Sequence, residues 1–240
     1  VFVVMGLTED FNPRRLERYL VIIHESGARP VVLLNKADLL PADELGALVA
    51  ETRAVAGDSP VHAVSALRGD GVAAVHALMG RGVTVMLVGS SGAGKSTLVN
   101  ALFGEERMSV GEVRESDGRG RHTTTQREML FLPGGGILID SPGLREIQLL
   151  PAEDGIGETF DDVAALAEGC RFRDCSHVAE PGCAVRAALE SGELDESRFE
   201  SWQRLQDEGE AGRARRLREG ERRHKAFRDL AARRRVEGRE

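Results

Sequence analysis

The stretch "GSSGAGKST" at residues 89–97 indicates a phosphate-binding loop. It follows the apolar run "VTVMLV" at 83–88 and opens a helical pattern, which is the strand–loop–helix context that this motif requires. Glycines let the backbone curl so that several N–H groups face a phosphate at the positive end of a helix dipole. In such loops the lysine contacts the β- and γ-phosphates and the following serine gives its hydroxyl to Mg²⁺. The candidate phosphate-binding residues are Gly89, Ser90, Ser91, Gly92, Ala93, Gly94, Lys95, Ser96 and Thr97, with Ser96 as a magnesium ligand.

A second motif, "NKAD" at residues 35–38, follows the apolar run "VVLL" and indicates guanine recognition. The carboxylate of Asp38 can accept hydrogen bonds from N1–H and the 2-amino group of guanine, whereas adenine would leave it unpaired. Asn35 can either bond the base edge or tie neighbouring loops together. The segment "SAL" at 65–67 ends the next predicted strand, where GTPases place a second base-contacting loop. The candidate guanine-binding residues are Asn35, Lys36, Ala37, Asp38, Ser65 and Ala66.

The order of these motifs is unusual, because the guanine-reading segments precede the phosphate loop. Four apolar runs, at 1–5, 29–35, 61–66 and 83–89, alternate with helical patterns, which predicts βαβ units and a parallel sheet. Two further strands are expected to form a hairpin around Gly134 and Gly135. We therefore expect a circularly permuted P-loop GTPase domain of the α/β class, a mostly parallel sheet with helices on both faces, over residues 1–155. A small α-helical domain is expected over 156–240.

The predicted strand "GILID" ends at Asp140, which is also the first residue of the motif "DSPG" at 140–143. Asp140, at a strand end beside the phosphate loop, is a candidate magnesium ligand, acting through water. Gly143 can offer its N–H to the γ-phosphate, so that the segment after it would sense hydrolysis. Both are counted as GTP-binding candidates. Leu144 occupies the position where many GTPases carry a water-orienting glutamine, so another group must position the water.

Residues 104–125 contain many charges and close on "GRHTTT" at 120–125, which indicates a loop that changes with the bound nucleotide. One of Thr123, Thr124 and Thr125 is expected to ligate Mg²⁺, and the sequence does not distinguish them. His122 is the nearest candidate for orienting the attacking water, although an ordinary loop histidine is the alternative. The candidate catalytic residues are His122, Lys95 and Thr125.

All three cysteines of the chain, Cys170, Cys175 and Cys183, lie within 14 residues of one another and flank His177. Three thiolates and one imidazole form a closed tetrahedral ligand set for Zn²⁺. An odd number of cysteines argues against disulfides. A closed set predicts a structural ion, one per chain, that holds together a helical region too small for a large core.

The chain has 240 residues and a formal net charge of −7, but the charge is uneven. Residues 213–240 contain 12 Lys or Arg and 5 Asp or Glu, so this tail is basic while the preceding part is acidic. A basic tail favours a polyanionic partner, and a solvated helix with mixed charge is the alternative. No run of 18 apolar residues and no signal peptide is apparent, which predicts a cytoplasmic protein that binds no membrane. The apolar start "VFVVM" leads us to expect that residues upstream are missing.

The chain resembles the RsgA (YjeQ) family of ribosome small-subunit-dependent GTPases. The resemblance rests on "FNPRRLERYL", "NKADLL", "GSSGAGKSTLVNAL", "GRHTTT", "DSPGLRE" and "CRFRDCSHVAEPGCAV", which together span about residues 1–200. It implies a GTPase that acts late in small-subunit maturation, is stimulated by that subunit, binds its rRNA and uses the switch histidine, here His122. Members of the family also carry an RNA-binding N-terminal OB-fold, and we expect this chain to lack that domain.

Two other functions are consistent with these residues. The first is a nucleotide-gated RNA-binding module in which hydrolysis is incidental, and the effect of His122→Ala on turnover separates it from a true GTPase. The second is an ATP-dependent enzyme, which Asp38 disfavours. In either GTP-dependent case we expect Mg²⁺ with GTP, a structural zinc ion and a monomer.

Overall fold

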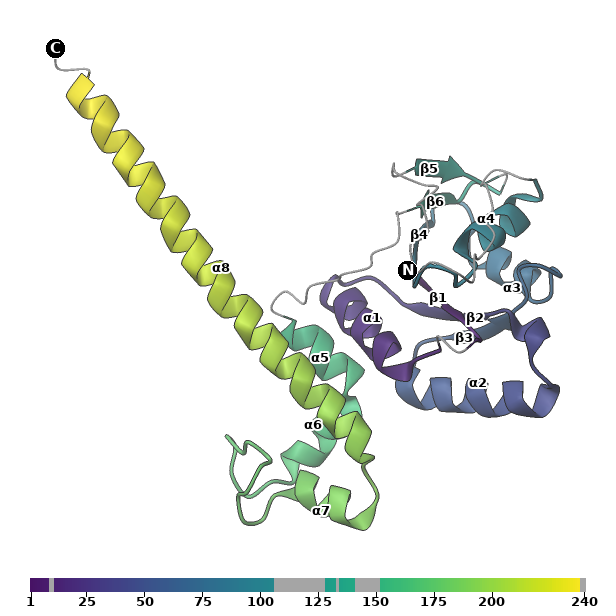
Figure 1. Ribbon diagram of the computed structural model, residues 1–240, viewed down its shortest axis with the longest axis horizontal. Coiled ribbons are helices and arrows are strands. Elements are labelled where there is room, and N and C mark those ends of the chain that lie inside the picture. The colour runs from purple at the N-terminus through teal and green to yellow at the C-terminus, as the bar shows by residue number, and fades with distance from the viewer. Residues whose placement is uncertain (9–10, 106–127, 133, 141–151, 238–240) are drawn as a thin grey trace, which may run out of the picture. The chain divides into compact units, whose positions relative to one another are not determined.

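The computed structural model describes residues 1–8, 11–105, 128–132, 134–140 and 152–237 (Figure 1). The chain divides into two compact units, Val1–Ile147 and Gln148–Glu240. The strands of the first unit are β1 (Phe2–Gly6), β2 (Val31–Asn35), β3 (Val61–Val64), β4 (Thr84–Val88), β5 (Glu128–Phe131) and β6 (Ile137–Asp140). Its helices are α1 (Pro13–Glu25), the 3₁₀ turn η1 (Ala37–Leu39), α2 (Ala42–Ala56), α3 (Val72–Ala77) and α4 (Lys95–Phe103).

The first unit is built on a six-stranded sheet in the order β3-β2-β1-β4-β6-β5. Each neighbouring pair is parallel except β5 and β6, which form the predicted antiparallel hairpin. Parallel strands need helical crossovers, and α1, α2 and α3 provide them between β1, β2, β3 and β4. The predicted mostly parallel α/β sheet is confirmed.

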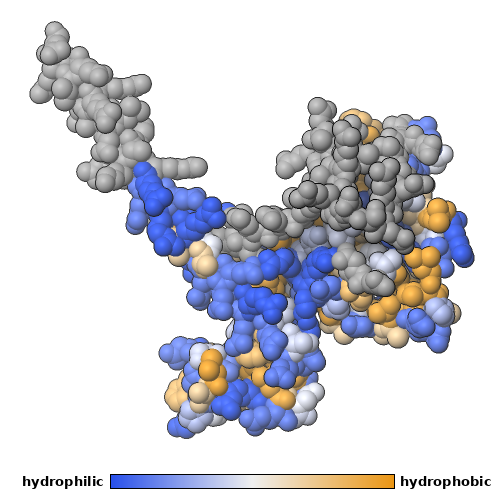
Figure 2. Space-filling model, viewed as in Figure 1, coloured by the Kyte–Doolittle hydropathy of each residue, from blue (hydrophilic) through white to orange (hydrophobic). Residues whose placement is uncertain are grey.

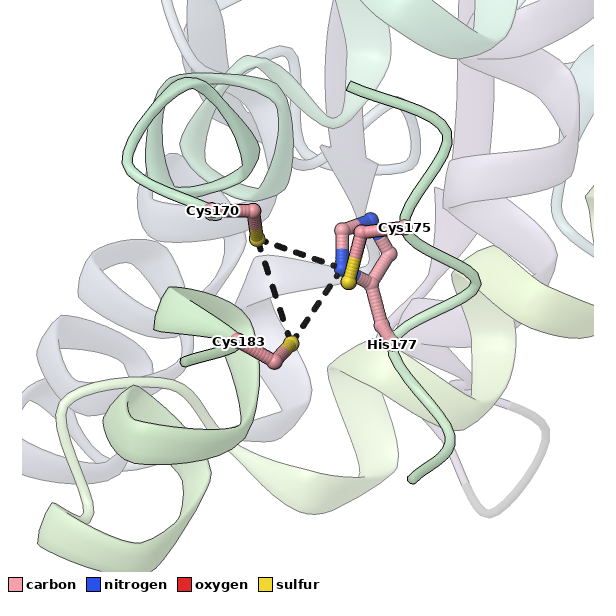
Figure 3. A group of neighbouring side chains, drawn as sticks. All are labelled: Cys170, Cys175, His177 and Cys183. Carbon is pink, nitrogen blue, oxygen red and sulfur yellow. Dashed lines mark hydrogen bonds between the residues drawn. The ribbon is translucent and has the colours of Figure 1, made fainter. Parts of the chain in front are cut away.

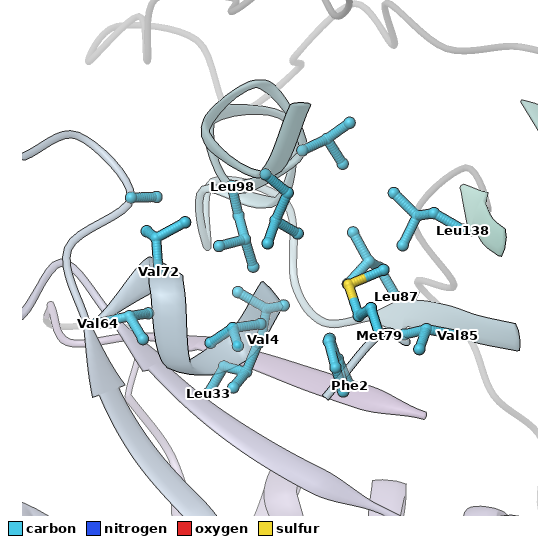
Figure 4. Close-up of a cluster of buried hydrophobic side chains, with 14 of the residues drawn as sticks. Phe2, Val4, Leu33, Val64, Val72, Met79, Val85, Leu87, Leu98 and Leu138 are labelled. Carbon is cyan, nitrogen blue, oxygen red and sulfur yellow. The ribbon is translucent and has the colours of Figure 1, made fainter. Parts of the chain in front are cut away.

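Alternate residues of the central strands enter two separate cores, one on each face of the sheet. On β1, Phe2 and Val4 face a core that contains residues of α3 and α4, while Val3 and Met5 face a core that contains residues of α1 and α2. Figure 4 shows the first core, where Leu98 of α4 and Met79 approach the strand side chains. Burial on both faces explains why these strands are almost continuously apolar in sequence.

The segment from β3 to α3 differs from the sequence-based expectation. The apolar run at 61–66 predicted a strand through Ala66, but β3 ends at Val64, and α3 begins at Val72. Ser65 leaves the strand and its N–H donates to the carbonyl of Asp70 at 2.9 Å. Gly71 then adopts a left-handed conformation (φ +73°), and a Cβ there would lie 2.7 Å from the carbonyl oxygen of Ala63. The result is a tight turn that begins at the serine of "SAL".

All regular secondary structure in the described part of the second unit is helical. It contains α5 (Glu153–Thr159), α6 (Asp161–Glu168), α7 (Ala184–Ser191) and the 42-residue α8 (Glu196–Glu237). The cysteine-containing loop joins α6 to α7 (Figure 1). Next to its grey end, the described part of α8 is mostly hydrophilic in Figure 2, although Leu217 is exposed. Its exposed arginines include Arg213, Arg215, Arg216, Arg218 and Arg222. None of the helices in the described ranges combines the length and apolar character needed to cross a bilayer.

Candidate nucleotide site and metal centre

The candidate nucleotide-binding loops meet because the parallel strands that carry them end at one edge of the sheet. Gly6 pairs with Asn35 and Asn35 pairs with Val64, so β1, β2 and β3 end at the same level. β4 leads into the phosphate loop at Gly89, and β6, which pairs in parallel with β4, ends at Asp140. Ligands of open parallel sheets bind outside these carboxyl ends.

The phosphate loop depends on glycines whose backbone and packing exclude a side chain. Gly89 (φ +147°) lies so close to β1 that a Cβ would be 2.2 Å from the carbonyl oxygen of Val4. Gly94 (φ +89°) ends the loop, and a Cβ there would be 2.3 Å from Nδ2 of Asn35. α4 begins at the next residue, Lys95, whose Nζ donates to the carbonyls of Gly89 at 2.8 Å and Ser90 at 2.6 Å. The ammonium group is thus held inside the loop, where it can meet phosphate oxygens.

Asn35 links all three loops through its side chain. Its Nδ2 donates to the carbonyl of Ala93 in the phosphate loop at 2.9 Å, and its Oδ1 accepts from the N–H of Ala66 in the "SAL" segment at 3.0 Å. The residue is 2% exposed. Of the two roles open to Asn35 from the sequence, the structure shows that it ties the loops together.

Asp38 is held in an orientation suited to reading a base. The hydroxyl of Ser65 donates to Oδ1 of Asp38 at 2.6 Å and accepts from the N–H of Arg68 at 3.1 Å. The Asp38 side chain is only 7% exposed, and its Oδ2 lies 3.7 Å from Nε of Arg68. The hydrogen bond from Ser65, helped by the nearby guanidinium and opposed by burial, lowers the pKa of Asp38. The carboxylate is therefore ionised at neutral pH and can accept two donors of a guanine edge.

Lys36 is one of two described non-glycine residues with a positive φ, at 68°. This left-handed conformation turns the chain sharply after β2 and starts η1, which carries Ala37 and Asp38. The other predicted phosphate-site residues lie where the sequence placed them. The phosphate loop contains Ser90, Ser91 and Gly92, and the first turn of α4 contains Ser96 and Thr97.

Four predicted site residues are not placed by the structure in full. His122, Thr125 and Gly143 lie outside the described residues. Asp140 is described only as the last backbone position of β6, next to β4. The expectations that concern water activation and magnesium at these positions remain predictions.

In the second unit, Cys170, Cys175, His177 and Cys183 bring their ligand atoms within 4.8 Å of one another (Figure 3). Sγ of Cys170 is 3.9 Å from Sγ of Cys183, and Nδ1 of His177 is 3.6 Å and 3.4 Å from these two sulfur atoms. A tetrahedral zinc site has edges of about 3.8 Å between sulfurs and about 3.6 Å between sulfur and nitrogen, given usual bond lengths. The sulfur separation is far longer than a disulfide bond of about 2.05 Å. The donor set and its spacing therefore fit a tetrahedral metal ion.

Local contacts fix the first and last cysteines of this cluster. The N–H of Arg171 donates to the carbonyl of Gly182 at 3.0 Å, which brings Cys170 beside Cys183. Cys183 is the N-cap of α7, and its Sγ accepts from the N–H of Arg186 at 3.4 Å.

His177 is enclosed on its other side by α8. The ring of Trp202 lies 5.6 Å from the His177 ring, and Phe199 stacks on Trp202 at 5.5 Å. His177 is 7% exposed, and burial lowers its pKa, which favours the neutral imidazole that a metal ligand must be. Trp202 was not among the residues singled out from sequence, because no motif spacing connects it to a histidine 25 positions earlier.

The fold and the two sites define the chain as a circularly permuted P-loop protein with a cysteine–histidine cluster. The chain belongs to the RsgA GTPase family, whose model matches residues 1–150. This confirms the resemblance inferred from the motifs.

Two relatives named "Small ribosomal subunit biogenesis GTPase RsgA" illustrate the similarity. The protein of Opitutus terrae is 52% identical over 100% of this chain and 66% of its own length. That of Xanthomonas euvesicatoria is 52% identical over 87% of this chain and 57% of its own length. The chain thus spans less than two thirds of either relative.

Two solved structures are also similar. YjeQ from Thermotoga maritima has a TM-score of 0.63 and 29% identity, over 87% of this chain and 70% of its own. The circularly permuted GTPase YloQ has a TM-score of 0.61 and 22% identity, over 88% of this chain and 68% of its own. The second likeness supports the permuted fold alone.

Proposed function

We propose that this chain binds and hydrolyses GTP in the cytoplasm and acts in late assembly of the small ribosomal subunit, which stimulates its activity. One observation carries the nucleotide part: a single buried residue, Asn35, bonds both the phosphate loop and the segment that orients the Asp38 carboxylate. A phosphate cradle and a base-reading group are thereby held together as one site. The names of the relatives support the ribosomal part.

In this proposal Asp38 reads N1–H and the 2-amino group of guanine, Ala66 contributes its backbone to the base loop, and Lys95 neutralises the β- and γ-phosphates. Ser96 and Asp140 hold Mg²⁺, the latter through water, together with one switch threonine, for which Thr125 is our candidate. Gly143 contacts the γ-phosphate, and His122 orients the attacking water in place of the glutamine that Leu144 replaces. GTP would order the two switch segments and favour the subunit-bound state, and hydrolysis would release it.

The second unit is proposed to hold one structural Zn²⁺ through Cys170, Cys175, His177 and Cys183. All four positions are filled by protein atoms, which leaves none for a substrate. The exposed arginines of α8 before residue 223 supply positive charge that suits rRNA phosphates. The chain is proposed to act as a monomer.

The decisive test is GTP turnover by this chain with and without added small subunits. We expect slow turnover alone and a large increase with subunits, and an unchanged rate would reject the ribosomal role.

His122→Ala should abolish stimulated turnover while GTP affinity is retained. Retained turnover in that variant would instead favour a nucleotide-gated RNA-binding module with incidental hydrolysis, and ATP binding as tight as GTP binding would reject guanine specificity.

A further inference from the structure

The loop that presents His177 is organised around one carboxylate, that of Glu180. Oε1 of Glu180 accepts from the N–H of Ser176 at 3.0 Å and from its hydroxyl at 2.5 Å. Oε2 accepts from the N–H of Val178 at 3.2 Å and from that of Ala179 at 3.1 Å. Four donors on residues 176–179 therefore converge on one side chain, on both sides of His177 in the sequence.

The backbone at His177 needs such support. His177 adopts φ +60°, the left-handed region that residues with a Cβ rarely occupy. This conformation turns the chain so that Nδ1 approaches the sulfur atoms of Cys170 and Cys183 (Figure 3). Ser176, Val178 and Ala179 are themselves exposed, so their own burial does not hold the turn.

We propose that Glu180 is the positioning residue of the metal centre: its carboxylate holds residues 176–179 in the turn that directs Nδ1 of His177 at the three thiols. This inference rests on the proposed zinc site. Without the carboxylate, the exposed N–H groups of the turn would bond water and the turn would sample other conformations. Part of the free energy of metal binding would then be used to order His177. The metal affinity would fall, although the four ligands would stay the same.

The other contacts around the site act on different groups. Trp202 of α8 contacts the ring of His177, and the hydrogen bond from the Arg171 N–H to the Gly182 carbonyl brings Cys170 beside Cys183. The N–H groups of Ser176, Val178 and Ala179 all donate to Glu180, whereas the N–H of His177 donates to the Cys175 thiol. The Glu180 carboxylate therefore holds the part of the loop that carries His177.

The test compares zinc affinity of the full chain by competition with a chromophoric chelator, for the parent, Glu180→Ala and Glu180→Gln. We expect Glu180→Ala to weaken zinc binding about 10- to 100-fold. Glu180→Gln should fall between, because an amide oxygen can accept from one pair of donors while its NH₂ group cannot accept from the other. Glu190→Ala is the matched control: Glu190 is an exposed α7 glutamate paired with Arg186 at 3.5 Å, and its loss should leave affinity within about twofold.

A second readout separates positioning from a general role in folding. With saturating Co²⁺ in place of zinc, both Glu180 variants should regain the absorption spectrum of a tetrahedral site with three sulfurs and one nitrogen. Zinc affinity equal to that of the Glu190 control, or failure to regain that spectrum, would overturn the inference. If the parent chain binds no stoichiometric zinc, the proposed zinc site itself fails.

Discussion

Asp38 illustrates how much one carboxylate can determine. It is almost buried, it accepts from Ser65, and its pKa is lowered, so it presents a fixed anionic acceptor. A fixed acceptor of this kind discriminates strongly, because a base that lacks the matching donors leaves it buried and unpaired.

Asp38→Asn should change which base is bound. An amide offers one acceptor and one donor, a pattern that matches N1–H and the 2-oxo group of xanthine and opposes the 2-amino group of guanine. We expect GDP affinity to fall by roughly 100-fold or more and XDP affinity to rise. Equilibrium titration with fluorescent GDP and XDP measures both. Equal loss of affinity for the two nucleotides would argue that Asp38 supports the loop without reading the base.

The junction between β4 and α4 shows how a strand, a turn and a helix together form a cradle. Gly89 must lie against the backbone of β1, and a methyl group there would meet the carbonyl oxygen of Val4 at 2.2 Å. The close approach follows from the order of the sheet, in which β1 and β4 are neighbours.

Gly89→Ala should therefore destabilise the first unit and distort the phosphate loop. We expect a loss of about 1–3 kcal/mol in the free energy of unfolding, together with weaker GDP binding. Urea unfolding followed by circular dichroism measures the first effect. Gly46→Ala is the control, because Gly46 lies inside α2 with open space around it and should gain about 0.5–1 kcal/mol. A Gly89→Ala variant as stable as the parent would contradict the close approach of the phosphate loop to β1.

The start of α8 is joined to α5 and α6 by a buried arginine. Nε and Nη2 of Arg198 both donate to the carboxylate of Asp162 at 2.9 Å, Nη2 also reaches the carbonyl of Thr159 at 2.9 Å, and the guanidinium lies 4.4 Å from the Phe160 ring centroid. A bidentate pair between a guanidinium and a carboxylate is among the stronger polar contacts in proteins.

Arg198→Ala should lower the stability of the second unit by about 2 kcal/mol, because the Thr159 carbonyl loses a partner while Asp162, which is 42% exposed, can be rehydrated. Thermal unfolding of the zinc-loaded chain gives the change. Arg204→Ala, on an exposed position of the same helix, should have almost no effect. Similar losses in both variants would show that the contribution is not specific to the Asp162 pair.

At the scale of the whole molecule, the candidate nucleotide site is built from residues of the first unit and the cysteine–histidine cluster from residues of the second, so we expect the two sites to respond separately to metal removal. The first unit has a sheet with a core on each face, whereas the described part of the second consists of four helices and the cysteine–histidine cluster. We expect a small helical unit of this kind to gain part of its folding free energy from a metal bound at the cluster.

Removing zinc with a strong chelator should unfold or loosen the second unit and leave guanine nucleotide binding by the first unit intact. Differential scanning calorimetry should then lose one transition, and fluorescent GDP titration should give an unchanged dissociation constant. Adding back zinc should restore the transition. Loss of GDP binding on chelation would mean that the nucleotide site depends on the metal.

Local patterns in the chain predicted the permuted α/β fold, and they singled out the residues that the structure brings together in the candidate phosphate loop and the cysteine–histidine cluster. The apolar runs have the lengths of buried strands, and the phosphate-loop glycines and clustered cysteines reflect requirements that act over a few residues. The order of the motifs along the chain also indicates the permutation, because it is a property of the sequence itself.

Packing between distant segments decided which hydrogen bonds and ring contacts hold the two sites together. Asn35 bonds Ala93 and Ala66, Glu180 folds the turn around His177, and Trp202 of α8 covers the imidazole. The early end of β3 likewise follows from a bridge between Ser65 and Asp70. No residue pattern shows these contacts, because hydrogen-bond partners and ring contacts depend on which side chains the completed fold brings within a few ångströms of each other.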